Sequence, residues 1–315
     1  MPSLPISDPL VFEPLFMERV WGGRRLEELY GKKLPADLRI GESWEIVDRP
    51  EAQSIVRDGP LRGKSLHELW QNHRREIFGD IADAPRFPLL IKLLDARETL
   101  SVQVHPPNEL AAELGGEAKT EFWYIADADA GAELFVGLRA GSTREKFEVA
   151  LHKGEVADHV HRISVQTGDA MFLPSGRVHA IGGGNLIVEV QQNSDTTYRV
   201  FDWNRKGSDG KPRALHVEQS LRCIDFDDCE PALSNAQHEL LVRGSHFEVQ
   251  KWKLDAEREV APAGEFAIIF CLADELTCGG TRISAGEFFL LPASAKNRMI
   301  HPAPASELLR ITLPP

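Results

Sequence analysis

Hydrophobic residues along the chain occur mostly in short runs that are separated by glycine, proline, aspartate and asparagine. Apolar runs of this length, rich in β-branched and aromatic residues and bounded by turn residues, predict strands. The runs cover residues 87–96, 120–128, 132–138, 169–174, 185–192, 247–254, 265–273, 286–293 and 307–313. The chain is therefore predicted to be mainly β, a barrel or sandwich with a few short helices.

Two segments have helical spacing instead. In SLHELWQNHRREIFG, apolar residues recur at helical intervals between a Ser65 N-cap and Gly79. In STREKFEVALHKG, Ser142 and Glu145 have the spacing of a capping box, and Gly154 is a typical helix end. We expect a helix in each segment.

A pattern in the middle of the chain recurs near its end. ISVQTGDAMFLPSGRVHAI aligns with TRISAGEFFLLPASAKNRM, which places Gly168 over Gly286 and Pro174 over Pro292. The second copy has Asn297 where the first has His179. Because the shared positions are few and mostly apolar, a chance match is the alternative explanation.

The repeat, if real, predicts two related β barrels, of which only the first has kept its chemistry. We expect residues 1–235 to form an N-terminal catalytic domain with helical additions. Residues 236–315 are expected to form a second, similar domain without a metal site.

Composition and charge narrow the function. The chain has 315 residues, 42% of them hydrophobic, and a formal net charge of −12. This charge repels nucleic-acid backbones and anionic lipid, so neither is an expected partner. No leader pattern and no membrane-spanning apolar run occur, which predicts a cytoplasmic protein. The four cysteines form no CxxC pair and are read as reduced thiols.

The segment TLSVQVHPPNEL holds the first candidate chemistry. Gln103 and His105 are two residues apart on a predicted strand, so both side chains point the same way before Pro106 ends the strand. This is the geometry of two ligands for one ion. Taken alone, a histidine before a proline is more often a surface or core residue.

A second pattern gives these residues a context. Gly168, Pro174, Gly176 and His179 have the spacing of the second metal motif of the cupin jelly roll. The first cupin motif corresponds to Gln103 and His105, followed by Glu121 in AKTEFWYI. A glutamine in place of the first histidine, with a KTE segment supplying the carboxylate, resembles the type I phosphomannose isomerases in their short bacterial form.

The resemblance includes further blocks in the family's order. They are FPLLIKLLDARETLSVQVHP, GGEAKTEFWYI, LPSGRVHAIG and EVQQNSDTTYRVFDWNR, with the more peripheral VWGGRRL and GESWEI near the N-terminus. The resemblance is close over roughly residues 10 to 215 and loose elsewhere. It implies two cupin-like jelly-roll barrels.

The resemblance also implies a site. The implied metal ligands are Gln103, His105, Glu121 and His179. Two imidazoles, a carboxylate and an amide oxygen suit a borderline divalent cation, so we expect one Zn²⁺ per chain, with another divalent metal as the alternative.

Other residues receive expected roles beside this metal. Arg199 is the implied active-site arginine, and Lys119 and Glu189 are the candidates for the base that carries the proton. Substrate binding is expected from Ser101, Lys92 and Asp195. Without the family context, Arg199 would be read as a structural salt bridge to Asp195 or Asp202.

The implied activity is the interconversion of mannose 6-phosphate and fructose 6-phosphate through a cis-enediol intermediate. Two rivals remain open. A cupin oxygenase with Fe(II) could use a similar ligand set but predicts no phosphate-binding charge near the metal. A non-catalytic sugar-binding cupin would tolerate loss of the ligands. His159 and His161 share the two-apart spacing and are the best competing histidine pair.

Overall fold

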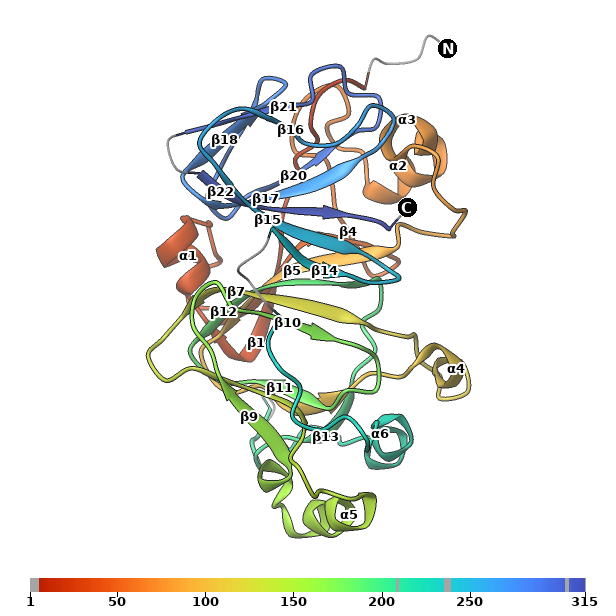
Figure 1. The fold of residues 1–315 in the computed structure, drawn as a ribbon, viewed down its shortest axis with the longest axis vertical. Coiled ribbons are helices and arrows are strands. Elements are labelled where there is room, and N and C mark those ends of the chain that lie inside the picture. The colour runs from red at the N-terminus through yellow and green to blue at the C-terminus, as the bar shows by residue number, and fades with distance from the viewer. Residues whose placement is uncertain (1–5, 208–209, 235–238, 304–305, 315) are drawn as a thin grey trace.

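The structure is a computed structural model that describes residues 6–207, 210–234, 239–303 and 306–314. Its strands form two barrels stacked along the long axis of the molecule, the second, C-terminal one drawn mostly in blue at the top of Figure 1. The mainly β fold expected from the hydrophobic pattern is confirmed. Every run predicted to be a strand overlaps a strand of the structure.

The first barrel consists of two sheets of antiparallel strands. The larger sheet has the order β1 (Leu15–Gly23), β2 (Ile40–Ile46), β5 (Leu89–Ala96), β12 (Asn185–Gln192), β7 (Glu121–Ala128) and β10 (Ala170–Leu173). The smaller sheet has the order β13 (Tyr198–Phe201), β6 (Val102–Val104), β11 (His179–Ile181), β8 (Glu133–Leu138) and β9 (Val160–Ser164). A two-stranded ribbon of β3 (Asp48–Arg49) and β4 (Ala52–Gln53) lies outside both sheets.

The second barrel repeats this arrangement with fewer residues. One sheet has the order β14 (Leu240–Arg243), β15 (Glu248–Leu254), β22 (Ser306–Thr312), β17 (Ala267–Ala273) and β20 (Phe288–Leu291). The other has the order β16 (Arg258–Glu259), β21 (Met299–Pro302), β18 (Glu275–Cys278) and β19 (Thr281–Ser284). The expected boundary at residue 235 lies outside the described residues.

A hydrophobic core also lies between the two barrels. It joins the outer face of the six-stranded sheet, with Ile91 and Val188, to the facing sheet of the second barrel, with Ile268 and Leu309. Alternation along β12 explains this, because Val188 and Val190 point to the shared core while Glu189 points into the first barrel. The barrels therefore pack as one body.

The N-terminal segment crosses between the barrels. Leu10 forms an isolated bridge with Leu290 of β20, and Phe12 forms one with Val56. Val11 belongs to the interior core of the second barrel. Residues from the start of the described chain thus complete the C-terminal barrel.

Short helices lie at the edges of the sheets. They are α1 (Arg25–Tyr30), α2 (Leu66–Asn72), α3 (Arg74–Phe78), α4 (Asn108–Ala111), α5 (Arg144–Lys153) and α6 (Val217–Cys223), with a 3-10 turn η1 (Val156–Asp158). None of the described helices is long and apolar enough to cross a membrane.

The two predicted helices are present with local differences. Ser65 caps α2 in a capping box with Glu68, but the backbone leaves helical geometry at His73, so the segment forms two helices. The expected capping box of Ser142 is wrong by one residue. Thr143 is the N-cap of α5, because the hydroxyl of Ser142 is engaged with His159.

The repeated segments occupy corresponding places. Gly168 and Gly286 both have positive φ, at 97° and 86°, in the turns before β10 and β20. Only glycine adopts this conformation without strain. The position aligned with His179 differs in environment as well as identity, since His179 is buried and Asn297 is exposed.

Candidate active site

Three predicted metal ligands meet inside the first barrel. Ligand atoms of His105, Glu121 and His179 all lie within 4.8 Å of one another, and all three residues are buried. The distance to a Glu121 oxygen is 3.3 Å from Nε2 of His105 and 3.6 Å from Nε2 of His179. Glu121 comes from the six-stranded sheet, whereas His179 begins a strand of the opposite sheet.

The hydrogen bonds of the two histidines orient them toward a shared point. Nδ1 of His105 lies 2.8 Å from the carbonyl oxygen of Thr196, and Nδ1 of His179 lies 2.9 Å from that of Arg177. Each Nδ1 must therefore carry the proton, which leaves the lone pair on Nε2. Within the described residues, both Nε2 atoms and both oxygens of Glu121 are buried without a hydrogen bond, apart from the ion pair that Lys119 makes with Oε1 of Glu121. Buried donor atoms left in this way fit a bound cation.

Gln103 shares this face of the smaller sheet. It lies directly opposite His179 on β11 and directly opposite Arg199 on β13. Residues paired across neighbouring strands point to the same side, so all three side chains face the barrel interior. The even spacing of Gln103 and His105 was thus a sound guide to their common face.

Lys119 neutralises the carboxylate of the cluster. Its Nζ lies 2.6 Å from Oε1 of Glu121, and both residues are buried. Burial alone would raise the pKa of Glu121, but Lys119 and His105 hold that pKa well below its usual range. Burial opposes the charge of Lys119, yet Glu121 and Glu189 raise its pKa above the ordinary value. Burial lowers the pKa of His179 to about 3, so the imidazole stays neutral.

Glu189 forms a second buried charged group beside the first. Its Oε2 accepts a hydrogen bond of 2.9 Å from the indole of Trp123, and Oε1 lies 3.4 Å from Nζ of Lys92. Lys92 lies 3.8 Å from Asp195 as well. Burial and the nearby charge of Glu121 raise the pKa of Glu189, which brings it closer to the range useful for proton transfer.

Arg199 is not the structural salt bridge considered from the sequence. Asp202 binds Arg205 and Arg213 instead, and no carboxylate among the described residues pairs with Arg199. Its Nη1 donates to the carbonyl of Ala214 at 3.0 Å, while its Nε is buried and makes no hydrogen bond in the described part of the chain. Burial and the charge of Arg213 lower the pKa of Arg199, and the opposing effect of Asp202, which is paired with other arginines, is smaller.

A cavity of about 440 Å³ connects these groups. Of the residues predicted from the sequence, Gln103, Ser101, Lys92, Lys119, Glu189, Asp195 and Arg199 line it. The lining has five cationic side chains, on Arg19, Lys92, Lys119, Arg199 and Arg213, against three anionic ones, on Glu42, Glu189 and Asp195. Glu121 and Asp202, just outside the lining, pair with Lys119 and Arg213. Arg199 is thus the cation of this lining that pairs with no described carboxylate, and it favours an anionic ligand at this place.

Comparison with known proteins places the chain in a family. The model of the phosphomannose isomerase type I catalytic domain matches residues 10–148. The mannose-6-phosphate isomerase ManA of Bacillus subtilis (strain 168) is 38% identical over 306 residues, which cover 94% of this chain and 93% of that protein. The chain belongs to the type I phosphomannose isomerases. The mannose-6-phosphate isomerase of Streptococcus mutans serotype c is 37% identical over 303 residues, or 93% of this chain and 95% of that one.

Solved structures of the family agree in fold. The crystal structure of the mannose 6-phosphate isomerase from Bacillus subtilis superposes with a TM-score of 0.87 at 34% identity. The match covers 98% of this chain and 100% of that one, so both barrels are included. The cupin-like architecture expected from the resemblance is confirmed for this phosphomannose isomerase.

Sequence reasoning missed several residues of the phosphomannose isomerase cavity. Arg19 and Glu42 come from β1 and β2 and form an ion pair of 2.9 Å, and Arg213 and His216 come from the segment before α6. Nδ1 of His216 accepts a hydrogen bond from the backbone nitrogen of Arg199, so Nε2 is its donor atom. Glu42 lies in the GESWEI block, but no role was assigned to it from the sequence. Arg19, Arg213 and His216 lie outside the quoted blocks, so no motif indicated them.

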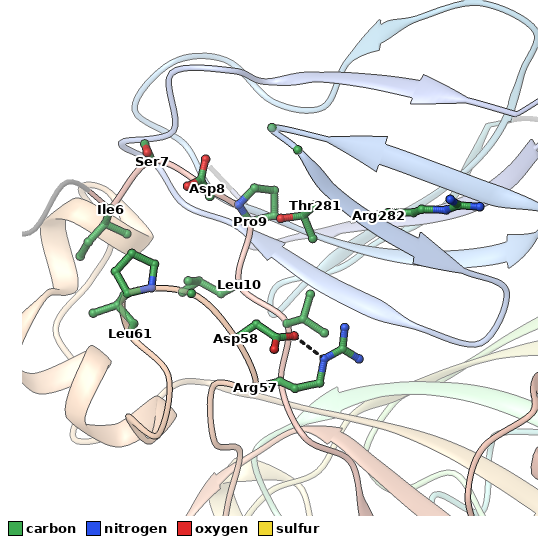
Figure 2. Close-up of a pocket in the computed structure, with 15 residues that line it drawn as sticks. Ile6, Ser7, Asp8, Pro9, Leu10, Arg57, Asp58, Leu61, Thr281 and Arg282 are labelled. Carbon is green, nitrogen blue, oxygen red and sulfur yellow. Dashed lines mark hydrogen bonds and ion pairs between the residues drawn. The ribbon is translucent and has the colours of Figure 1, made fainter.

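Other cavities and histidines do not match this site. Figure 2 shows a cavity of about 390 Å³ between the N-terminal segment and the β18–β19 hairpin of the second barrel. There Arg57 is paired with Asp58 at 2.7 Å, and Arg282 is paired with Glu275. The competing histidine pair has no metal geometry, since within the described ranges only His105, Glu121 and His179 form a group of three ligands.

Proposed function

We propose that this chain interconverts mannose 6-phosphate and fructose 6-phosphate with the aid of one divalent metal ion, expected to be Zn²⁺. The observation that carries the proposal is that two features lie next to each other, a group of buried donor atoms and a cavity. The donor atoms of His105, Glu121 and His179, of which only Glu121 Oε1 has an ion pair, with Lys119, adjoin a cavity lined by Arg199, a cation without a described carboxylate partner. A metal ion and a phosphosugar would satisfy these two features separately.

The metal would be held by His105, Glu121 and His179, with Gln103 as the fourth ligand. The donor set fits a catalytic site better than a structural one, which would be rich in cysteine and closed. Bound there, the ion would act as a Lewis acid that polarises the oxygens of the substrate. All four cysteines are unpaired and outside this cluster.

The isomerisation moves a proton between C2 and C1 of the sugar by way of a cis-enediol. Of the two candidate bases, Glu189 is better suited because burial raises its pKa toward neutrality. Lys119 has a raised pKa and is paired with Glu121, so it stays protonated and can donate to a substrate oxygen instead. We therefore assign proton transfer to Glu189 and orientation to Lys119.

The remaining cations of the cavity would bind negative charge. Arg199 has no carboxylate partner among the described residues and is suited to stabilise charge that develops on the enediol oxygen. Lys92, Ser101 and Asp195 would hold other polar groups of the phosphosugar. The cation Arg199, which lacks a described carboxylate partner, also counts against the Fe(II) oxygenase, which needs no anion site next to its metal.

The second barrel has no part in this chemistry, on our proposal, and residues 236–315 would form a domain without a metal site. The described part of the second barrel holds no group of three metal-ligating side chains, which supports this division. Oligomeric state is a separate matter on which the proposal does not depend.

A coupled assay of mannose 6-phosphate conversion, with and without a chelator, tests the proposed function. We expect activity that chelation abolishes and Zn²⁺ restores. Free mannose is the comparison substrate and should be turned over far less efficiently, since binding energy from the phosphate helps to position the reacting carbons. Equal turnover of the two sugars would refute the phosphosugar assignment.

A further inference from the structure

Two loops border the proposed metal site on one side. Residues 117–120 lead directly into β7, and so place Lys119 and Glu121. Residues 193–197 connect β12 to β13. Neither loop is part of a sheet, so their positions depend on contacts other than the strand ladders.

The two loops are hydrogen-bonded to each other. The backbone nitrogen of Glu117 donates to Oγ1 of Thr196 at 2.9 Å, and Oγ of Ser194 donates to the carbonyl of Glu117 at 3.1 Å. Next to the first strand residue, Thr120 and Gln192 exchange hydrogen bonds of 2.9 and 3.1 Å. A displacement of one loop therefore moves the other.

The carboxylate of Glu117 lies between two guanidinium groups. Its Oε2 is 2.9 Å from Nη1 of Arg49, and its Oε1 pairs with Nη2 of Arg86. Both arginines also donate to the carbonyl oxygen of Asn193, at 3.2 and 3.1 Å. We call Glu117, Arg49, Arg86 and Asn193 the latch. Glu117 and the carbonyl of Asn193 contact both positive charges, whereas Glu51 pairs with Arg49 alone.

The latch is anchored to the rest of the barrel. Nδ2 of Asn193 donates to the carbonyls of Asp48 and Phe87, at 2.8 and 2.7 Å, and these residues are chain neighbours of the two arginines. The buried carboxylate of Asp48 accepts a hydrogen bond from the nitrogen of Phe87 at 2.8 Å. The frame behind the latch is thus fixed, and Glu117 is the member that ties the first loop to it.

The second loop orients a metal ligand. The carbonyl oxygen of Thr196 accepts the hydrogen bond from Nδ1 of His105, and this bond determines which way the imidazole presents Nε2. Thr196 is at the same time the acceptor for the backbone of Glu117. The path from the latch to the metal ligand therefore passes through a single residue.

We propose that Glu117 is a positioning residue for the metal centre, an inference that rests on the metal ion of the proposed function. Without the charge of Glu117, Arg86 has no carboxylate partner among the described residues, while Arg49 keeps only its pair with Glu51, so the tie between the two arginines and the first loop is lost. The loop that carries Thr196 then loosens, and His105 loses its fixed orientation. Groups that orient metal ligands in this indirect way commonly change metal affinity by tenfold or more.

The test measures metal affinity in Glu117→Gln. The metal-depleted variant is titrated with Zn²⁺ in competition with a chromophoric chelator, and its melting temperature is recorded with and without Zn²⁺. We expect about tenfold weaker Zn²⁺ binding. The rise in melting temperature on adding Zn²⁺ should be smaller than in the unmodified chain, because stabilisation by a ligand follows its affinity.

Glu113→Gln is the matched control. Glu113 lies in the same stretch of chain and pairs with Arg222 at 2.6 Å, but this pair is exposed and does not touch either loop. This variant should bind Zn²⁺ like the unmodified chain. Glu117→Asp keeps the charge but is too short to reach both arginines. Its Zn²⁺ affinity should lie between those of Glu117→Gln and Glu113→Gln, and it is the milder of the two substitutions at Glu117.

A double variant separates positioning from a general loss of stability. Adding Arg86→Gln to Glu117→Gln removes the cation that Glu117→Gln leaves without a carboxylate partner and should recover part of the Zn²⁺ affinity. Affinity in Glu117→Gln equal to that of Glu113→Gln would overturn the role of the latch while leaving the proposed metal site intact. An unmodified chain that takes up no Zn²⁺ would overturn both.

Discussion

The two barrels share a scaffold and differ in what fills it. In the first, Glu121 of β7 lies opposite Leu173 of β10. In the second, the equivalent pair is Ala267 of β17 opposite Leu291 of β20. Leu173 and Leu291 are aligned in the sequence repeat, so Ala267 stands where the first barrel has Glu121, the proposed metal-binding carboxylate. The strand register is retained, but the ligand is not.

A second interior carboxylate of the first barrel, Glu189, is also replaced in the second barrel. Glu189 lies between Trp123 and Lys92 on neighbouring strands. The corresponding position is Arg310, which lies between Ile269 and Gln250. The second interior also holds Phe289, Leu308 and Ile300, and Arg310 donates there to the carbonyl of Val260. The jelly-roll fold therefore does not require a carboxylate at either of these two interior positions.

The largest predicted effect, on metal content and activity, is expected when the first barrel loses a proposed metal ligand. His179→Ala removes an imidazole that points at Glu121, so we expect no bound metal and activity lower by about a thousandfold, the loss expected when several kcal/mol of charge stabilisation disappear. Elemental analysis and the coupled assay measure the two quantities. Asn297→Ala, at the aligned position of the second barrel, is the control and should change neither. Full metal occupancy in His179→Ala would place the site elsewhere.

Placing a carboxylate at the equivalent position of the second barrel should destabilise the protein. Ala267 is fully buried, and in Ala267→Glu the new charge would have no Lys119 beside it. An uncompensated buried charge costs about 3–5 kcal/mol, so urea denaturation should show a strongly destabilised protein that gains no second metal. Ala267→Leu adds volume without charge and separates overpacking from electrostatics. Equal stability of the two variants would mean that the second interior tolerates charge.

A more moderate effect is expected at Arg199. Arg199→Lys keeps the positive charge but loses the planar guanidinium group, so kcat should fall by about a hundredfold while folding and metal content stay normal. Arg310→Lys provides the corresponding change inside the second barrel and should leave kcat unchanged. Thermal melts run beside the kinetics. A destabilised Arg199→Lys whose folded fraction is nearly fully active would show a structural arginine.

The smallest predicted effect concerns how the free energy of unfolding depends on pH through Glu42, a carboxylate of the first barrel. Burial alone would raise the pKa of Glu42, but Lys92 and Arg19 lower it to about 2. A carboxylate with a depressed pKa stabilises the fold above its unfolded pKa of about 4.5, and this contribution is lost as pH falls toward 2.

Glu42→Gln should therefore be less stable by about 2 kcal/mol at pH 7, with a deficit that shrinks below pH 4.5. Unfolding free energies from urea titrations at several pH values measure this. A deficit that stays constant with pH would assign the loss to packing rather than to charge.

The hydrophobic pattern and the motif spacing were informative for different parts of the molecule. The run 185–192 matches β12 at both ends, because this strand is packed on both faces and turn residues lie on either side of it. Gln103 and His105 were placed on one face by spacing alone. Such features are local, and local physics determines them.

Residues assembled by long-range topology were not predictable in this way. Arg19 and Glu42 reach the cavity only because β1 and β2 extend the larger sheet at its edge. Arg213 lines the cavity and is held there by its ion pair with Asp202. The cap of α5 moved to Thr143 since a distant histidine, His159, competes for the hydroxyl of Ser142. In each case the deciding partner is far away in the sequence.

The bridge between Leu10 and Leu290 has a consequence for how the chain folds during its synthesis. The two residues come together only after nearly the whole sequence has been translated. The proposed metal ligands, by contrast, all lie between residues 103 and 179, and can assemble while the C-terminal strands are still being made. Until then the apolar outer face of the larger sheet is exposed. Folding should therefore pass through an aggregation-prone species, with closure of the second barrel as the late step.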